Sequence, residues 1–113
     1  WLGVKTSVGG IARYYNDYYY QQSTELDVVP GNPWFICSCW YAKYLIRKAA
    51  HKNDMKEPLG ILNWIVDHAI PTGLLPEQLD PITGEGLSVC PLTWSHAEFV
   101  DTMTDYVNKL EKL

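Results

Sequence analysis

The chain has 113 residues, the size of one ordinary domain, and a formal net charge of −4 from 9 Lys and Arg against 13 Asp and Glu. Its basic residues form no cluster, which argues against nucleic-acid binding, and no apolar stretch approaches the ~20 residues of a membrane-spanning helix. Its three cysteines lack zinc-type spacing with the three histidines, so we expect packed thiols rather than a disulfide framework or a metal site.

Residues 1–33 are predicted to be mainly loop. They contain three glycines among the first ten residues, then the tyrosine-rich stretch "RYYNDYYYQQ", then "PGNP", and no helical or strand period persists. A loop of this length in a compact domain is usually functional or supported by neighbouring chain. The chain opens on Trp1 with no signal-like segment and no initiator Met, so we expect an excised piece whose compartment the sequence leaves open.

A first helix is predicted from about Pro33 to Lys52. Asn32 is a good N-cap residue, and proline suits the first helical position because its missing N–H has no helical partner there. The helix is apolar on almost every side in its first three turns, and such a helix is normally surrounded by protein. Its partner is expected to be the rest of its own domain, or a second copy that covers the apolar helix 33–52.

Two further helices are predicted, at about 57–70 and 95–113. Pro58 suits the first turn of the former, and Pro71-Thr72-Gly73 should stop it. The latter opens with a capping box, in which Ser95 and Glu98 satisfy each other's free backbone N–H groups. No stretch alternates with period 2, so the predicted class is all-α, with about three helices and long functional loops.

The candidate catalytic and binding residues lie in the loops and at the helix starts. Glu77 follows Pro76, which stiffens its loop, and a stiff carboxylate suits the activation of water, although loop acids are commonly solvated. Arg13 and Asp17 stand four apart, as a solvated ion pair or as a guanidinium held ready for substrate oxygens. Two tryptophans adjoin predicted helix starts, where an indole either fills a core or lines a sugar-binding cleft; they are Trp34 and Trp94.

Three motifs together resemble a known family. "GGIARYYNDYYYQ", "GNPWFICSCWYAKYLI" and "GLLPEQLDPITGEGLSVCPLTWSHAEFV" occur in the order and with the spacing of the C-terminal part of glucoamylase-type enzymes, glycoside hydrolase family 15, most similar to the prokaryotic and archaeal branch. The resemblance covers essentially the whole chain. It implies an (α/α)6 barrel, of which residues 1–113 would form the C-terminal portion of the catalytic domain.

The resemblance also implies roles for single residues. Glu77 matches the catalytic base, and Arg13 with Asp17 matches the sugar-binding motif, beside which Tyr19 is a further match. Trp34 and Trp94 match tryptophans that line or back the cleft. The sequence departs from the family pattern at positions outside these groups, where family members often carry Pro, Ser and a different helix sequence; they are Gly86, Cys90 and "ICSCWYAKY".

The implied function is that of an inverting exo-acting α-glucosidase, which releases glucose from the non-reducing ends of α-glucans or oligosaccharides. Inversion needs two carboxyl groups, and the family's acid lies upstream of the motifs found here, so we expect the isolated chain to be catalytically silent. This chemistry requires no cofactor. The alternatives are a trehalase or glucodextranase of the same family, a non-catalytic glucan-sensing or regulatory domain, and three helices of an unrelated assembly.

Overall fold

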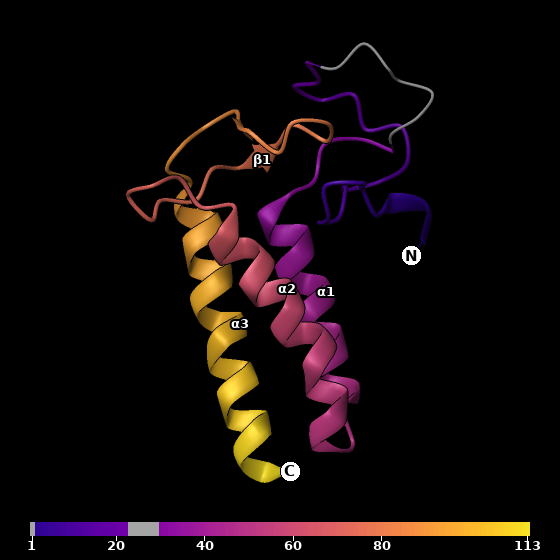
Figure 1. Cartoon of the computed structure of the whole chain (residues 1–113), viewed down its shortest axis with the longest axis vertical. Coiled ribbons are helices and arrows are strands. Elements are labelled where there is room, and N and C mark those ends of the chain that lie inside the picture. The colour runs from indigo at the N-terminus through magenta and orange to yellow at the C-terminus, as the bar shows by residue number, and fades with distance from the viewer. Residues whose placement is uncertain (1, 23–29) are drawn as a thin grey trace.

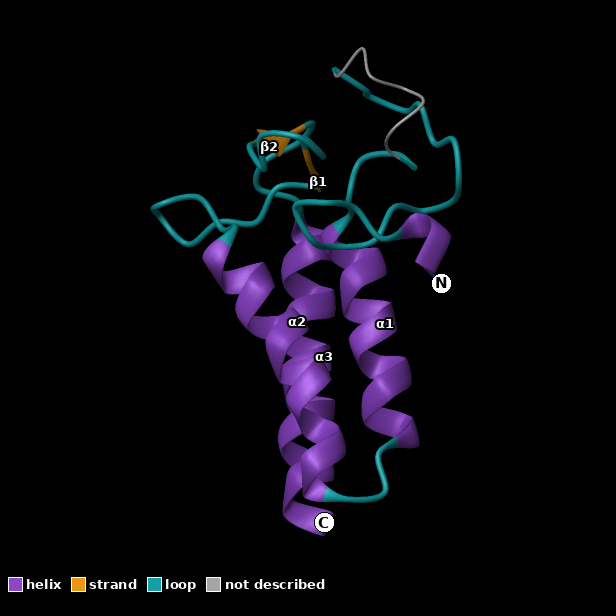
Figure 2. Ribbon diagram, turned by 45° about the vertical axis from the view of Figure 1, so that its right-hand side comes forward, coloured by secondary structure: helices purple, strands orange, loops and turns teal. Residues whose placement is uncertain are grey.

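The computed structural model describes residues 2–22 and 30–113. Three α-helices run alongside one another: α1 (Phe35–Lys48), α2 (Lys56–Asp67) and α3 (Thr93–Lys112) (Figure 1). The loops before α1 and those between α2 and α3 gather at one end of the helices, whereas the α1–α2 connection lies at the other end (Figure 2). The predicted all-α class is confirmed, and no helix of the described residues is long and apolar enough to cross a bilayer.

Helix α1 is shorter than predicted at both ends. It begins at Phe35 because Trp34 is still extended, with φ −106° and ψ 135°, and the predicted N-cap at Asn32 is wrong. The Asn32 side chain is buried and donates instead to distant groups, described below. The helix ends at Lys48 because Ala49 leaves the helical region at ψ 127°; the short 3₁₀-helix η2 (Lys52–Met55) then leads into α2.

The predicted capping box of α3 is also wrong. The helix begins at Thr93, so Ser95 lies within its first turn, where its buried Oγ donates to the carbonyl of Pro76 at 2.9 Å. Glu98 accepts hydrogen bonds from Trp40 and Lys43 of α1. Both side chains therefore tie α3 to other segments, and these tertiary bonds take the place of the local bonds that the sequence pattern predicted.

Two clusters of buried side chains hold the helices together. The cluster at the loop end joins α1 and α2 to the segment after α2, and the other joins the far ends of all three helices; their members are Phe35, Cys39, Ile65, Leu75 and Leu79, and Ile46, Ala49, Met55, Leu62 and Tyr106. Two large aromatic side chains of α1 remain partly uncovered, since Trp40 is 46% and Tyr44 42% exposed. In the described chain, α1 is thus not enclosed on every side.

Short β pairings join the loops around Trp34. Strands β1 (Gln78–Leu79) and β2 (Gly86–Leu87) form an antiparallel pair with Gln78 opposite Leu87. Trp34 bridges to both Ile11 and Gln78, and its N–H donates to the Ile11 carbonyl at 2.9 Å. Strands of two residues are too short to show a period in the sequence, which is why these pairings were not predicted.

The N-terminal loop is anchored on α2 through a glycine pair. The indole N–H of Trp64 donates to the carbonyl of Val8 at 2.8 Å, and the ring lies against Gly9 and Gly10. A Cβ added at Gly10 would meet the Trp64 ring and lie 2.8 Å from Cβ of Pro33. Gly10 also has φ +75°, in the region that favours glycine. The close approach of loop and helix therefore requires glycine here.

Candidate active site

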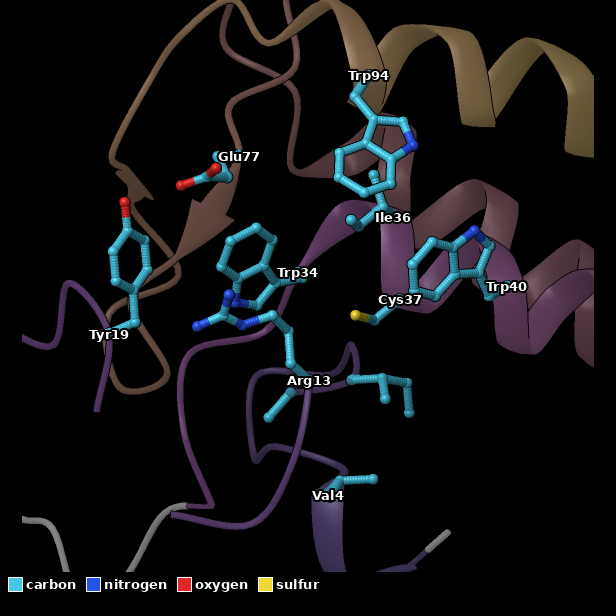
Figure 3. A pocket seen from close by; sticks show the side chains of 11 residues that line it. Val4, Arg13, Tyr19, Trp34, Ile36, Cys37, Trp40, Glu77 and Trp94 are labelled. Carbon is cyan, nitrogen blue, oxygen red and sulfur yellow. The ribbon is translucent and has the colours of Figure 1, made fainter. Parts of the chain in front are cut away.

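An open cavity of about 490 Å³ lies where the loops meet the N-terminal ends of α1 and α3 (Figure 3). Its size falls within the range of roughly 300–1,000 Å³ that small-molecule sites occupy. Figure 3 shows Tyr19 and Glu77 towards one end and Trp40 and Trp94 towards the other, with Trp34 and Arg13 between them. Apolar side chains complete the lining; they are Val4, Ile11, Ala12, Ile36 and Cys37.

Glu77 is fixed at its backbone and at one carboxylate oxygen. Its N–H donates to the carbonyl of Val89 at 2.9 Å, and its carbonyl accepts from the N–H of Phe35, the first residue of α1, at 3.4 Å. Oε2 accepts from Nε2 of Gln78 at 2.9 Å and from Oγ of Ser88 at 2.6 Å. Oε1 has no hydrogen-bond partner among the described residues, so it is available to accept a proton from water.

Arg13 and Asp17 form a two-pronged ion pair. Arg13 Nε lies 2.7 Å from Asp17 Oδ2, and Nη2 lies 2.9 Å from Oδ1. Asp17 is 1% exposed and also accepts from the N–H of Tyr19 at 3.2 Å. Burial by itself would raise the pKa of Asp17, but the hydrogen bonds from Arg13 and Tyr19 outweigh it and hold that pKa below its ordinary value. Asp17 thus orients the arginine rather than lining the cavity.

The guanidinium of Arg13 faces the cavity on an aromatic support. Its central carbon lies 4.3 Å from the ring centroid of Trp34 and 5.0 Å from that of Tyr19, both within cation–π range. Asp17 occupies two of the five N–H donors of the guanidinium, and the other three have no partner among the described residues. Arg13 can therefore offer hydrogen bonds to the hydroxyl groups of a ligand.

The opposite end of the cavity is an aromatic pair. Trp94, 51% exposed, packs against Trp40 with ring centroids 5.9 Å apart and planes at 62°. The Trp40 indole N–H donates to Glu98 at 3.0 Å, and Glu98 also accepts from Lys43 at 3.0 Å. Trp94 is therefore a wall of the cavity rather than a core residue. Exposed indole faces of this kind can pack against the C–H faces of a sugar ring.

Five of the six residues singled out in the sequence line this one cavity, and the sixth, Asp17, supports it from behind. The sequence analysis missed Trp40 and both groups that bind the carboxylate of Glu77. Gln78 is adjacent in sequence, but Ser88 becomes a neighbour only through the β1–β2 register, which sets Gln78 opposite Leu87. The turn residues of "DPITGEG" carried a signal for this hairpin.

Glu77 carries the only carboxyl group among the described residues that line the cavity. The acids considered as its counterpart lie elsewhere: Glu57 accepts from the hydroxyl of Tyr41 at 3.1 Å, Glu98 binds Trp40 and Lys43, and the exposed Glu85 is not among the lining residues. No group of three His, Cys, Asp or Glu among residues 2–22 and 30–113 could hold a metal ion.

The cavity thiol is not prepared for nucleophilic chemistry. Burial raises the pKa of Cys37 to about 11, despite the nearby charge of Arg13. A thiol with so high a pKa is almost wholly protonated near neutral pH, and the thiolate is the nucleophile. The arrangement can therefore bind a polyol ring between aromatic side chains and an arginine, and can activate a water through one carboxylate.

Comparisons with known proteins agree with this chemistry. The sequence model described as Glycosyl hydrolases family 15 matches residues 2–104. An uncharacterized glycosyl hydrolase of Methanocaldococcus jannaschii is 32% identical over 105 residues, an alignment that covers 85% of this chain and 15% of that protein. This chain thus spans a small part of the length of that relative. No solved structure matches this chain. Because the family match extends over nearly all of the sequence, the chain belongs to glycosyl hydrolase family 15.

Proposed function

We propose that this chain is part of an inverting exo-acting α-glucosidase that releases glucose from the non-reducing ends of α-glucans, with Glu77 as the general base. The observation that carries the proposal is the convergence on one cavity of a carboxylate with a free oxygen, an arginine with free donors, and exposed indole rings. Family membership supports the hydrolase class, and the cavity chemistry supports a sugar as the substrate.

In the proposed mechanism, a water bound to Oε1 of Glu77 loses a proton to the carboxylate as its oxygen attacks the anomeric carbon. The bonds from Gln78 and Ser88 hold Oε2, so the carboxylate keeps one orientation towards that water. Arg13 donates to hydroxyl groups of the terminal sugar, while Trp34 supports the guanidinium from below. Holding the reactants in this geometry lowers the entropic part of the barrier.

The counterpart acid is proposed to come from another segment of the same polypeptide. Inverting hydrolysis uses two carboxyl groups roughly 6.5–9.5 Å apart, one of which protonates the leaving oxygen. The small share of the relative that this chain spans supports a longer catalytic domain, of which residues 1–113 would be the C-terminal part of an (α/α)6 barrel. The exposed aromatic side chains of α1, Trp40 and Tyr44, would then be covered by the remainder of that domain, or by a second copy.

The test is hydrolysis of maltose and soluble starch by the full-length polypeptide that carries this chain. Glu77→Gln should reduce kcat by at least about 10²–10⁴-fold with sugar binding retained, because the amide cannot accept the proton. Glu85→Gln, on an exposed side chain of the same loop region, is the matched control and should leave turnover unchanged. Undiminished turnover by Glu77→Gln would reassign the base. The anomer first released, followed by NMR, should be β.

Two other substrates and one other class remain as candidates. Trehalose and dextran differ from starch in the linkage beyond the terminal glucose, so a substrate panel on the same polypeptide separates them. A glucan-sensing domain without hydrolysis is the candidate of another class. It is favoured by the lone carboxyl group among the described cavity residues, and binding of maltooligosaccharide with no release of glucose would establish it.

A further inference from the structure

Behind Glu77 lies a pair of buried side-chain amides, of which the mechanism above uses only Gln78. Gln78 is fully buried and Asn32 is 1% exposed, and Nδ2 of Asn32 donates to Oε1 of Gln78 at 2.9 Å. Neither residue lines the cavity. Asn32 stands 46 residues from Gln78 in sequence, so the pair joins the segment before α1 to the loop that carries Glu77.

The orientation of both amides follows from one backbone group. Asn32 also faces the carbonyl oxygen of Tyr20, at 3.2 Å from Nδ2. A carbonyl oxygen can only accept, so the Asn32 atom that faces it is the NH₂ group. The Gln78 atom beside that NH₂ group must then be the oxygen, and the NH₂ group of Gln78 is turned to Glu77, to whose Oε2 it donates at 2.9 Å. Asn32 thus donates both to the carbonyl of Tyr20 and to Gln78, and Gln78 in turn donates to Glu77.

This directionality matters because an amide can be flipped. A Gln78 turned by half a rotation would present its oxygen to the carboxylate of Glu77, which accepts hydrogen bonds and repels a second acceptor. The contact is part-buried, so solvent screens that repulsion less than it would in open water. Asn32 excludes the flipped state, because its NH₂ group would then meet the NH₂ group of Gln78.

We propose that Asn32 is a positioning residue for Glu77, which acts through Gln78 by fixing the direction of the amide that donates to the carboxylate. The inference rests on the proposed function of Glu77 as the general base. Asn32 does not cap α1, because the N-cap position is Trp34; the Asn32 amide is turned instead to Gln78 and Tyr20.

The side-chain amide of Asn32 also connects the Glu77 loop to the loop that holds Arg13 and Tyr20. Tyr20 has φ +58°, an uncommon conformation for a bulky residue, and its carbonyl is the group that Asn32 binds. Arg13 and Tyr19 belong to this loop and line the cavity. Asn32 therefore makes two hydrogen bonds with different expected effects. Loss of the bond to Gln78 should lower kcat, and loss of the bond to Tyr20 should change KM.

The experiment is a double-variant cycle in the full-length polypeptide, with maltose as substrate. Asn32→Leu and Gln78→Met keep approximately the shape of each side chain and remove its hydrogen bonds, and the variant that carries both leaves no amide of the pair without a partner. Asn32→Leu should lower kcat about tenfold, the rate equivalent of one lost hydrogen bond, with a smaller change in KM. Asn63→Leu, at an exposed position of α2, is the control and should retain the kcat of the wild type.

If Asn32 acts through Gln78, the second substitution adds little: the double variant should lie within about threefold of Gln78→Met alone. Losses in kcat that multiply would show that Asn32 works independently of Gln78 and would overturn the proposal. An Asn32→Leu variant with the kcat of the wild type would overturn it equally. Melting temperatures separate folding from positioning: the double variant should melt no lower than the less stable single variant, because its amides are removed together.

Failure of this inference can be told from failure of the proposed function by Glu77→Gln, measured alongside. If Glu77→Gln is inactive and both Asn32→Leu and the control retain full kcat, only the positioning role falls. If Glu77→Gln keeps the turnover of the wild type, the assignment of the base itself falls, and the positioning role falls with it.

Discussion

The pair of Arg13 and Asp17 should be unequal in its response to substitution, because the two side chains differ in burial. The Arg13 side chain is 32% exposed, whereas that of Asp17 is 1% exposed. Arg13→Met leaves a buried carboxylate without its partner, which costs about 3–5 kcal/mol in a fully buried pair. Partial exposure of the arginine screens the interaction, so we expect a loss of about 2–3 kcal/mol in the free energy of unfolding at pH 7. Asp17→Asn leaves a guanidinium that still reaches water, and should cost less.

The stability loss of Arg13→Met should also depend on pH, and the pKa of Asp17 sets the direction of that dependence. In the wild type the pKa of Asp17 is depressed, so its stabilisation is present above the ordinary carboxyl pKa and is lost as the pH falls through the folded-state value. In Arg13→Met the buried acid takes up a proton more readily, so the stability deficit should shrink, by up to about 1.4 kcal/mol per pH unit, as the pH falls from the raised carboxyl pKa of the variant towards the ordinary value. Urea unfolding of the full-length polypeptide at several pH values measures it, with Arg47→Met of the exposed end of α1 as the control. A deficit that does not change with pH would refute the reasoning.

Two further predictions concern packing and thiol access. Gly10→Ala should lower the free energy of unfolding by about 2–4 kcal/mol, because the methyl group meets Trp64 at a left-handed φ. Gly60→Ala, in α2 with open space around it, should instead raise it by about 0.5–1 kcal/mol, and equal effects in thermal denaturation would count against the described loop anchorage. A thiol reagent at pH 8 should modify exposed Cys90 first, since burial raises the pKa values of the two cysteines of α1 to about 11 and about 12; mass spectrometry showing all three modified at one rate would contradict it.

Periodicity and motif order predicted the helices and most of the cavity, because both depend on residues close together in sequence. Proline and glycine placed α2 within a few residues of its observed bounds, and five residues taken from three separate motifs line one cavity. The motif carried the information that Glu77 and Arg13 belong together, since no local rule brings positions 64 apart in the chain to one site. What the sequence predicted well was therefore either local or inherited from a family pattern.

The errors share one physical cause, namely that distant partners compete with local bonds. Asn32 and Ser95 are both favourable capping residues, yet Trp34 and Leu92 occupy the N-cap positions, and the two polar side chains are turned to groups far along the chain. Ser88 was missed because its contact with Glu77 depends on strand register, which two-residue strands do not reveal in sequence. Full burial of the first helix was expected from its composition, but the covering of Trp40 depends on neighbours that composition does not identify.

Trp34 has both a structural role, through its backbone, and a role in the cavity, through its ring. Its backbone connects the N-terminal loop, the start of α1 and the Glu77 loop, while its ring supports the guanidinium that faces the cavity. A substitution there would loosen three segments at the same time as it altered the cavity lining, so natural or laboratory selection for a new ligand has little freedom at this position. Tyr19 and Trp94 also border the cavity, but more than half of each side chain faces solvent. Substitutions that change ligand preference should therefore accumulate at these two rings, while Trp34 stays constant because the fold depends on it.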